Sequence, residues 1–488
     1  MNYSRRQRIG SGGSSSGVVR GCGGGMHDGD RPTKEGGKEM KTLLVGIDGL
    51  SWNVLSGLVR DGHMPHMRSF IENGVSGQMD NLGQSNSPVI WTTVATGKLA
   101  AEHQVLDFTD LFPRPGRIKE FLFRKMPFLG RKFLARLGWA FESRVGSTHR
   151  RCKALWNVFS DMGRSVGVGG WWATYPAEPV NGFVVSDQAN YYRLKINKDV
   201  GAITLKEEDL SGLRGTVYPE LSREVIASWH PLDEEGLLQF ASRFTDLDDD
   251  AQRRFRELST HRKGEPLSVL KFGIYIDQFT LVSFKQMLLR QEEQPDLLAV
   301  YFGGVDGPSH AFWKYTFPEQ FPSLSPEEKS GFETVLPRYY EWMDDVLGEL
   351  LAVVDREQTV AIVLSDHGFE AADEQKARIG ISGTHENAPN GVFLMNGPGV
   401  ETGKEVDARS IDFAPTLLYL AGLPVADDMP GRVLAAALTE EFRESYPPAA
   451  VPTYEVGDGS LPRAVAGREP SEADEAIKDH LRALGYIE

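Results

Sequence analysis

Five short polar segments carry the residues of this chain that could do chemistry together. They are Gly46-Ile-Asp48-Gly49, Ser87 to Thr93, Asp306 to His310, Ser365 to Gly368 and Gly383 to His385. Between them they offer three Asp, three His and the serine Ser87 as a candidate nucleophile. Carboxylates and imidazoles together suit zinc or manganese better than calcium, which prefers oxygen ligands. Such a set could hold two divalent metals beside a serine nucleophile, an arrangement that enzymes use to hydrolyse phosphate esters.

Each candidate ligand has an ordinary structural role when it is considered alone. Asp48 before a glycine is typical of a turn or a helix cap. Asp306 and His310 are four residues apart, so a helix would place both on one face. The adjacent pair Asp366 and His367 is as compatible with a turn as with metal binding, and a lone loop histidine such as His385 is usually exposed. The metal hypothesis therefore depends on these residues occurring together.

Ser87 is the candidate nucleophile. Pro88 follows it, so Ser87 could equally be the N-cap of a helix expected over residues 89–95. No Gly-x-Ser-x-Gly turn surrounds Ser87, which argues against an acyl hydrolase. A serine hydroxyl needs activation, which a bound metal could supply, and a helix N-terminus would add N–H donors for phosphate.

Short apolar runs predict buried strands that alternate with helices. The strands are expected at 41–47, 165–169, 296–302, 359–364 and 392–395, and helical patterns lie between them, for example at 65–73 and 336–354. This alternation predicts a mostly parallel sheet covered on both faces. Asp48, Asp306 and Asp366 each follow such a strand closely. Because reactive groups collect beyond the carboxyl ends of parallel strands, we expect these three residues to share one site.

The motifs, taken in order, resemble the alkaline phosphatase superfamily and most closely the type I phosphodiesterase/nucleotide pyrophosphatase family. The resemblance also includes Val94-Ala-Thr-Gly97-Lys98, His103 and Asp412-Phe-Ala-Pro-Thr-Leu417, and it covers most of residues 41–440. It implies a three-layer α/β/α fold with cap insertions and a pair of divalent metals, zinc first, with manganese or magnesium as alternatives. The implied ligand sets are Asp48, Asp366 and His367, with the Ser87 oxygen, for one metal and Asp306, His310 and His385 for the other. Ser87 would attack phosphorus and form a covalent seryl intermediate.

Departures from the family pattern leave the substrate open. The family usually has Thr at the position of Ser87, Asn at that of Ile90 and Gly at that of Gln104. We therefore consider Asn86, Lys98 and Trp172 as candidate substrate contacts. A phosphodiesterase or nucleotide pyrophosphatase is the first hypothesis. A phosphomonoesterase or phosphonate hydrolase on the same scaffold, or a phospho-group transferase at a membrane surface, is the alternative. A sulfatase is disfavoured, because no Arg follows Ser87-Pro88 at the spacing that formylglycine maturation requires.

The catalytic domain is expected over residues 40–444, with insertions at about 110–150 and 198–290. Residues 114–136 contain eight Lys/Arg and one acid, interleaved with Phe and Leu. We favour a lid whose aromatic side chains pack on the core, with weak contact to an anionic membrane surface as the alternative. Residues 1–39 are rich in Gly and Ser and are expected to be disordered, with Met26 or Met40 as alternative starts. Residues 445–488 are expected to form a linker and a short helix at 471–484.

The bulk composition restricts partners and compartment. A net charge of −15 argues against a nucleic-acid polymer as partner but permits a small phosphorylated substrate that is bound through metals. No apolar run is expected to reach the length of a membrane span, and no apolar stretch of a signal peptide follows the N-terminal basic residues. With only Cys22 and Cys152, a disulfide framework is not expected, and a cytoplasmic location is the prediction. The oligomeric state is left open.

Overall fold

The computed structural model of the chain describes residues 40–114, 116–126, 128–191, 194–197, 202–205, 214–220, 232–258, 265–387 and 389–455. The disorder expected for residues 1–39 and the helix expected at 471–484 lie outside the described residues.

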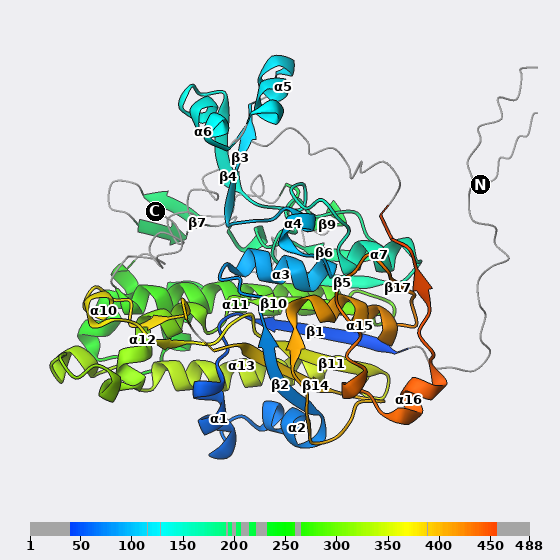
Figure 1. Ribbon diagram of the computed structural model, residues 1–488. Coiled ribbons are helices and arrows are strands. Elements are labelled where there is room, and N and C mark those ends of the chain that lie inside the picture. The colour runs from blue at the N-terminus through cyan, green and yellow to red at the C-terminus, as the bar shows by residue number, and fades with distance from the viewer. Residues whose placement is uncertain are drawn as a thin grey trace, which may run out of the picture. The chain divides into compact units, whose positions relative to one another are not determined.

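A mixed ten-stranded sheet forms the centre of the described domain (Figure 1). Its strand order is β15-β2-β14-β11-β1-β10-β5-β6-β9, and β16 also pairs with β2. The strands are β1 (Lys41–Ile47), β2 (Val75–Asp80), β5 (Val166–Gly169), β6 (Gly182–Val185), β9 (Val217–Tyr218), β10 (Leu297–Phe302), β11 (Thr359–Leu364), β14 (Gly391–Asn396), β15 (Lys404–Glu405) and β16 (Ala408–Arg409). The adjacent strands β11, β1, β10, β5 and β6 are parallel, whereas β14 runs antiparallel to β11 and β2, and β9 to β6.

The five strands expected from the sequence are confirmed as β1, β5, β10, β11 and β14, with ends that differ by at most one residue. They read as continuous apolar runs because both faces of the parallel sheet are covered, and all six residues of β11 are buried. The three-layer α/β/α architecture is therefore confirmed by the observed sheet and by its helices.

Helices cover both faces of the sheet. Figure 1 shows α3 (Ser87–Thr96), α7 (Leu155–Asp161) and α15 (Phe413–Leu420) on one side and α1 (Trp52–Arg60), α2 (Pro65–Asn73) and α13 (Val335–Leu351) on the other. Helices α11 (Pro266–Leu288) and α12 (Asp306–Thr316) contact each other, and α12 also contacts α13. Further elements are the helices α4 (Ala100–His103), α9 (Glu234–Ala241), α10 (Asp249–Glu257), α14 (Glu374–Arg378) and α16 (Glu440–Ser445), and the strand pairs β7 (Leu194–Asn197) with β8 (Ala202–Leu205) and β12 (Glu370–Ala371) with β13 (Gly383–Thr384).

Helix α11 corrects the expectation about apolar runs. Its 23 residues include a window of mean hydropathy 1.2, so by length and composition it could cross a membrane, contrary to the expectation that no run is long enough. However, 78% of that window is buried inside the domain, where α11 packs on β5 and β10. A core helix meets the same test of length and composition. Helix α11, near the end of the expected insertion at 198–290, therefore packs on the central sheet, and the bounds of that insertion stay a prediction.

The basic segment forms part of a projecting hairpin, which we call the arm (Figure 1). It consists of β3 (Thr109–Pro113), α5 (Arg117–Lys125), α6 (Phe128–Arg136) and β4 (Ala140–Arg144), with β3 and β4 antiparallel. Phe123, Leu134 and Ala140 are buried in a small cluster of the arm itself. Phe121 and Phe133 are 61% and 56% exposed, so the expectation that the aromatic side chains pack on the core is wrong for these two.

The described start of the C-terminal segment also differs from the expected linker. Residues 450–451 form β18 (Ala450–Val451), which pairs in parallel with β17 (Val425–Ala426). The Tyr454 hydroxyl donates a hydrogen bond to the Pro424 carbonyl at 2.6 Å. These bonds hold residues 450–455 against the domain.

Candidate active site

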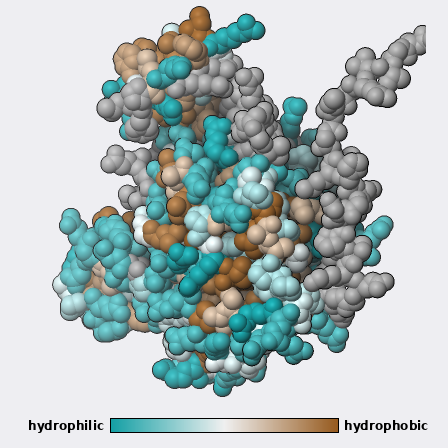
Figure 2. Space-filling view, turned by 45° about the vertical axis from the view of Figure 1, so that its right-hand side comes forward, coloured by the Kyte–Doolittle hydropathy of each residue, from teal (hydrophilic) through white to brown (hydrophobic). Residues whose placement is uncertain are grey.

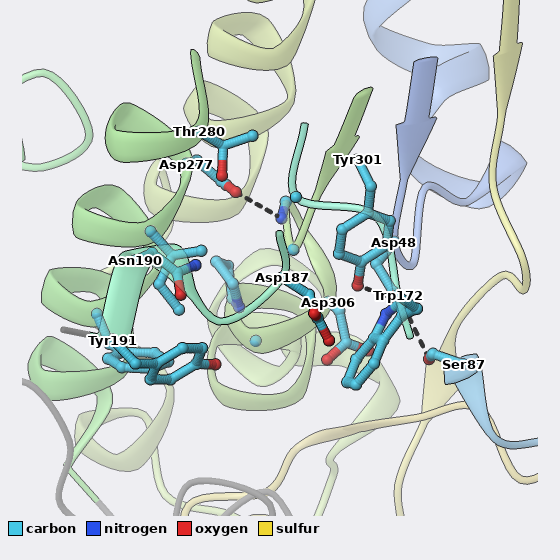
Figure 3. A pocket seen from close by; sticks show the side chains of 18 of the residues that line it. Asp48, Ser87, Trp172, Asp187, Asn190, Tyr191, Asp277, Thr280, Tyr301 and Asp306 are labelled. Atoms are coloured by element: carbon cyan, nitrogen blue, oxygen red, sulfur yellow. Dashed lines mark hydrogen bonds between the residues drawn. The ribbon is translucent and has the colours of Figure 1, made fainter. Parts of the chain in front are cut away.

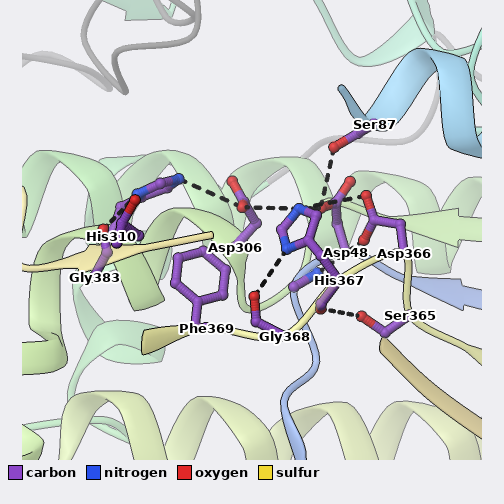
Figure 4. Close-up of polar contacts among 12 residues, drawn as sticks. Asp48, Ser87, Asp306, His310, Ser365, Asp366, His367, Gly368, Phe369 and Gly383 are labelled. Atoms are coloured by element: carbon purple, nitrogen blue, oxygen red, sulfur yellow. Dashed lines mark hydrogen bonds and ion pairs between the residues drawn. The ribbon is translucent and has the colours of Figure 1, made fainter. Parts of the chain in front are cut away.

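The three candidate aspartates meet beyond the carboxyl ends of adjacent parallel strands (Figure 4). Asp48 directly follows β1, Asp306 begins α12 after β10, and Asp366 comes two residues after β11. The register aligns Ile47 with Phe302 and Gly46 with Leu364, so all three strands end at the same level. The parallel sheet thereby brings together residues that are 258 and 60 positions apart in the chain.

A glycine allows this close approach. Gly49 has a φ of +72°, and a Cβ at this position would lie 2.9 Å from the Asp306 Cα atom and 2.8 Å from a ring carbon of Phe369. Any other residue would be strained and would push the start of α12 away from β1. The glycine after Asp48 therefore sets the spacing of Asp48 and Asp306.

The first group of possible metal ligands is Asp48, Asp366 and His367. One ligand atom from each lies within 4.8 Å of the others. The His367 Nε2 atom is 3.4 Å from both Asp48 Oδ1 and Asp366 Oδ2. The Ser87 hydroxyl donates to Asp48 Oδ1 at 3.4 Å, so the candidate nucleophile borders this group.

The second group is Asp306, His367 and His385, again with ligand atoms within 4.8 Å. His310 lies beside it, with Nε2 3.6 Å from Asp306 Oδ1. The His385 ring stacks on His367 with centroids 4.0 Å apart, and its centroid is 5.2 Å from that of His310. The structure thus brings all seven expected residues into one connected cluster, but His367 lies between the two groups rather than in one alone.

Backbone carbonyls orient two of the imidazoles. His310 Nδ1 lies 2.9 Å from the Gly383 carbonyl and His367 Nδ1 lies 3.2 Å from that of Gly368. A proton on Nδ1 in each case leaves the Nε2 lone pair directed at the aspartates, which is the usual arrangement of metal-binding histidines.

The donor set fits divalent metals. Asp366 Oδ2 and His367 Nε2 are buried and make ion-pair contacts at 3.4 Å but no hydrogen bond, although buried polar atoms normally have one. Burial and the neighbouring Asp48 carboxylate raise the pKa of Asp366 to about 7. Burial alone would lower the pKa of His367, but Asp366, Asp48 and Asp306 outweigh it and raise that pKa to about 10. The raised pKa of His367, and part of the raised pKa of Asp366, reflect negative charge that a bound cation would neutralise.

Two residues that the sequence analysis missed hold Asp48. The Tyr301 hydroxyl and the Trp91 indole N–H donate to Asp48 Oδ2 at 2.5 and 3.2 Å, which leaves Oδ1 facing Ser87 and His367. Burial would raise the pKa of Asp48, but hydrogen bonding and charge from His367 and the Tyr301 hydrogen bond lower it. The only sequence signal for Tyr301 was a hydroxyl group within the apolar run of β10.

A pocket extends from this cluster to a second polar region. Figure 3 shows Asn190 and Tyr191 at the end of the pocket away from Ser87. Trp172 and Asp187 lie between that end and Ser87. The Arg144 guanidinium also lines the pocket and lies 4.6 Å from the centroid of the Trp172 ring and 5.5 Å from that of Tyr191.

Several polar atoms of this second region lack hydrogen-bond partners although they are buried. They are Arg144 Nε and Nη1, Trp172 Nε1 and Asn190 Oδ1. Arg144 Nη2 is 3.8 Å from Asp187 Oδ2. Burial raises the pKa of Asp187, and Arg144 opposes this shift. The pocket therefore offers a buried cation and unsatisfied hydrogen-bonding groups that open onto the same cavity as Ser87.

The structure places the three residues expected to contact substrate in different surroundings. Trp172 lines the pocket, but its ring already contacts Phe108 and Tyr301 as well as Arg144. Asn86 donates to Asp107 Oδ1 at 3.2 Å at the start of α3. Lys98 follows the opposite end of α3 from Ser87, is 5% exposed and forms an ion pair with Asp428 at 2.8 Å. A ten-residue helix separates Lys98 from Ser87, and the expected contact of Lys98 with a substrate phosphate stays a prediction.

The start of α3 is less available to phosphate than the sequence indicated. The N–H groups of Val89 and Ile90 both donate to the Asn86 carbonyl, at 2.9 and 3.2 Å, and Pro88 has no N–H. The donors of the first helical turn after Ser87 are thus already engaged.

Together, the sheet and the cluster define an α/β protein with a buried set of metal-ligand residues beside a serine. A family model described as type I phosphodiesterase / nucleotide pyrophosphatase matches residues 42–411. This match covers more than half of the chain, so the protein belongs to the type I phosphodiesterase/nucleotide pyrophosphatase family. The family expected from the sequence motifs is confirmed.

Other similarities are partial or distant. Arylsulfatase K from Homo sapiens and from Bos taurus is 30% and 29% identical over 109 and 106 residues, which are 21% and 20% of this chain. The matched region spans about a fifth of each relative, 20% and 19% respectively.

Among solved structures, three similar ones have low sequence identity. The phosphonate monoester hydrolase SpPMH from Silicibacter pomeroyi is 15% identical, with 82% of this chain and 77% of that chain covered and a TM-score of 0.42. An inactive murine ectonucleotide pyrophosphatase / phosphodiesterase 5 in complex with AMP is 14% identical, with coverage of 82% and 100% and a TM-score of 0.42. Wild-type alkaline phosphatase PafA is 10% identical, with coverage of 82% and 99% and a TM-score of 0.46.

Proposed function

We propose that the protein is a metal-dependent phosphodiesterase or nucleotide pyrophosphatase that acts through a covalent intermediate on Ser87. The observation that carries the proposal is the position of the Ser87 hydroxyl, 3.4 Å from Asp48 Oδ1, at the edge of a buried cluster of three aspartates and three histidines. Family membership supports the same reaction class.

The cluster residues would hold two divalent metals, with zinc as the first expectation and manganese or magnesium as alternatives. Such ions would act as Lewis acids that lower the pKa of a hydroxyl group and neutralise charge on the phosphate. The Ser87 oxygen would form a bond to phosphorus as the bond to the departing oxygen breaks. Water would then cleave the seryl ester and regenerate the Ser87 hydroxyl.

The pocket supports an ester with a substantial second substituent. It extends from Ser87 and Asp306 to Arg144, Asn190 and Tyr191, so the part of the substrate beyond phosphorus would have a place to bind. The organic group of a diester, a pyrophosphate or a monoester would fit this extension, so the preference for a diester rests on family membership. A phosphomonoesterase or phosphonate hydrolase, which would use the same cluster, is the second candidate.

The test compares a chromogenic phosphodiester with the matching monoester, using metal-reconstituted protein and the Ser87→Ala variant. We expect faster turnover of the diester, which the substitution lowers by at least about a thousandfold and a chelator abolishes. The Ser69→Ala variant is the matched control, because it removes an exposed serine hydroxyl of α2 that is not part of the cluster. A preference for the monoester would move the assignment to phosphatase, and full activity of Ser87→Ala would contradict the seryl mechanism.

A further inference from the structure

The arm concentrates exposed apolar side chains at one place. Among the described residues, nine large hydrophobic side chains are exposed, and four of them lie on the arm. They are Ile118 and Phe121 of α5, at 71% and 61%, Phe133 of α6, at 56%, and Leu137 directly after α6, at 52%. Figure 2 shows hydrophobic and hydrophilic side chains next to one another at the top of the molecule.

These four side chains are not part of the arm's own core. That core is formed by Phe123, Leu134 and Ala140, with Leu111 and Trp139 among the residues packed against it. The Arg131 guanidinium also covers the Phe123 ring at 5.0 Å from its centroid. The exposed side chains of Phe121 and Phe133 therefore could enter a lipid bilayer without losing packing contacts in the folded protein.

The charge of the arm is opposite to that of the whole chain. Residues 114–136 contain eight basic residues and one acidic residue, whereas the chain carries a net charge of −15. The side chains of Arg117, Lys125, Lys132 and Arg136 are exposed beside the four apolar ones. Basic groups that flank exposed Phe, Leu and Ile on short helices are the composition of segments that lie in the headgroup region of anionic bilayers.

We propose that the arm docks this protein on an anionic lipid surface. Ile118, Phe121, Phe133 and Leu137 enter the boundary between headgroups and acyl chains, and the basic side chains contact lipid phosphates. Contact between the arms of two copies of the chain is disfavoured, because it would bring like charges together. A nucleic-acid polymer would account for the basic residues but not for the exposed apolar ones.

Docking would hold the pocket close to the surface. Phe108 directly precedes β3 and Arg144 ends β4, and both line the pocket, so the arm rises from the pocket wall. A strand of five residues spans roughly 17 Å, which sets the scale of the arm. The docking proposal does not depend on the proposed activity, and its test reads binding alone.

The experiment is flotation of the full chain with phosphatidylcholine vesicles that either contain or lack phosphatidylglycerol. We expect binding to the vesicles with phosphatidylglycerol and little binding to those without it. The double variant Phe121→Ser/Phe133→Ser should weaken binding by at least about tenfold, and Lys125→Glu/Lys132→Glu should abolish the preference for the anionic lipid. Leu289→Ser is the matched control, because Leu289 is 70% exposed but lies outside the arm, and it should bind like the unmodified protein.

Thermal unfolding of each variant confirms that the fold is intact. Equal vesicle binding by the arm variants and the unmodified protein would overturn the proposal, because the N-terminal basic residues would then account for the binding. Absence of binding to both vesicle types would also overturn it. So would size-exclusion data in which Phe121→Ser/Phe133→Ser converts a dimer to a monomer, since a second copy would then cover the arm.

Discussion

The Tyr301 hydroxyl donates a hydrogen bond to Asp48 Oδ2 at 2.5 Å. Tyr301 lies on β10 directly opposite Gly46 of β1, two residues before Asp48. The bond therefore joins neighbouring parallel strands at the point where both reach the cluster. It turns the carboxylate of Asp48 so that its other oxygen faces Ser87 and His367.

Replacing Tyr301 by Phe should weaken metal binding without unfolding the protein. The ring keeps its edge contact with Trp91 at 5.2 Å, whereas the hydrogen bond that orients Asp48 is lost. Loss of such an outer partner typically costs about 10- to 100-fold in metal affinity. Competition with a zinc-binding dye measures the change. Tyr454→Phe, which removes a tyrosine hydroxyl in the C-terminal segment, should leave the affinity unchanged, and equal effects of both substitutions would refute the role of Tyr301.

Removal of metal should destabilise the protein. The apo cluster holds the carboxylates of Asp48, Asp306 and Asp366 close together with little access to water. A ligand present at 100 times its dissociation constant stabilises a folded state by about 2.7 kcal/mol. We expect a chelator to lower the thermal midpoint by several degrees and zinc to restore it. An unchanged midpoint, together with no zinc retained after dialysis, would contradict the metal site.

Arg144→Met should impair substrates whose departing group carries a negative charge. Arg144 Nε and Nη1 are buried without partners in the pocket, and hydrogen bonds to charged groups contribute about 1.5–3 kcal/mol. We expect kcat/KM to fall by roughly 10- to 100-fold for a diester with an anionic substituent and much less for a neutral one. Because the substitution leaves Asp187 without its cation, Arg144→Met/Asp187→Asn is the control for charge balance. Equal losses for both substrates would show that Arg144 only supports the fold.

His103 should make stability depend on pH in the acidic range. Its Nδ1 accepts from the Val105 N–H and its Nε2 lies 3.1 Å from the Thr93 hydroxyl, an arrangement that needs a neutral ring. Burial, aided by Arg150, lowers the pKa of His103 from 6.5 to about 4. The resulting stabilisation is fully present above pH 6.5 and is lost as the pH falls towards 4. It amounts to on the order of 3 kcal/mol.

The measurement is urea unfolding between pH 4 and 8 for the unmodified protein and His103→Gln. Other buried histidines titrate as well, so the difference in the free energy of unfolding between the two proteins isolates the contribution of His103. This free-energy difference should shrink as the pH falls from 6.5 to 4. A parallel curve for His103→Gln would show that its ring is not held neutral.

The arm shows which features of the structure local sequence patterns do not predict. Its basic and aromatic composition was visible in the sequence, and the breaks at Pro and Gly agreed with two short helices. Which aromatics are buried depends on how α5 and α6 pack on β3 and β4. Phe123 lies on the inner side and Phe121 on the outer, although they are only two residues apart.

The sequence alone determined the strands, the aspartates that follow them and the family, because apolar periodicity and short motifs are local properties of the chain. It also placed Ser87 at a helix start, since Ser-Pro is a local signal. Only the tertiary structure decided the rest. Strand order and register place Tyr301 next to Asp48. The path of the chain places Arg144 and Asn190 in the pocket that Ser87 lines. The length of α3 places Lys98 next to Asp428. These contacts join residues far apart in the chain, and their geometry arises from packing rather than from any spacing along the sequence.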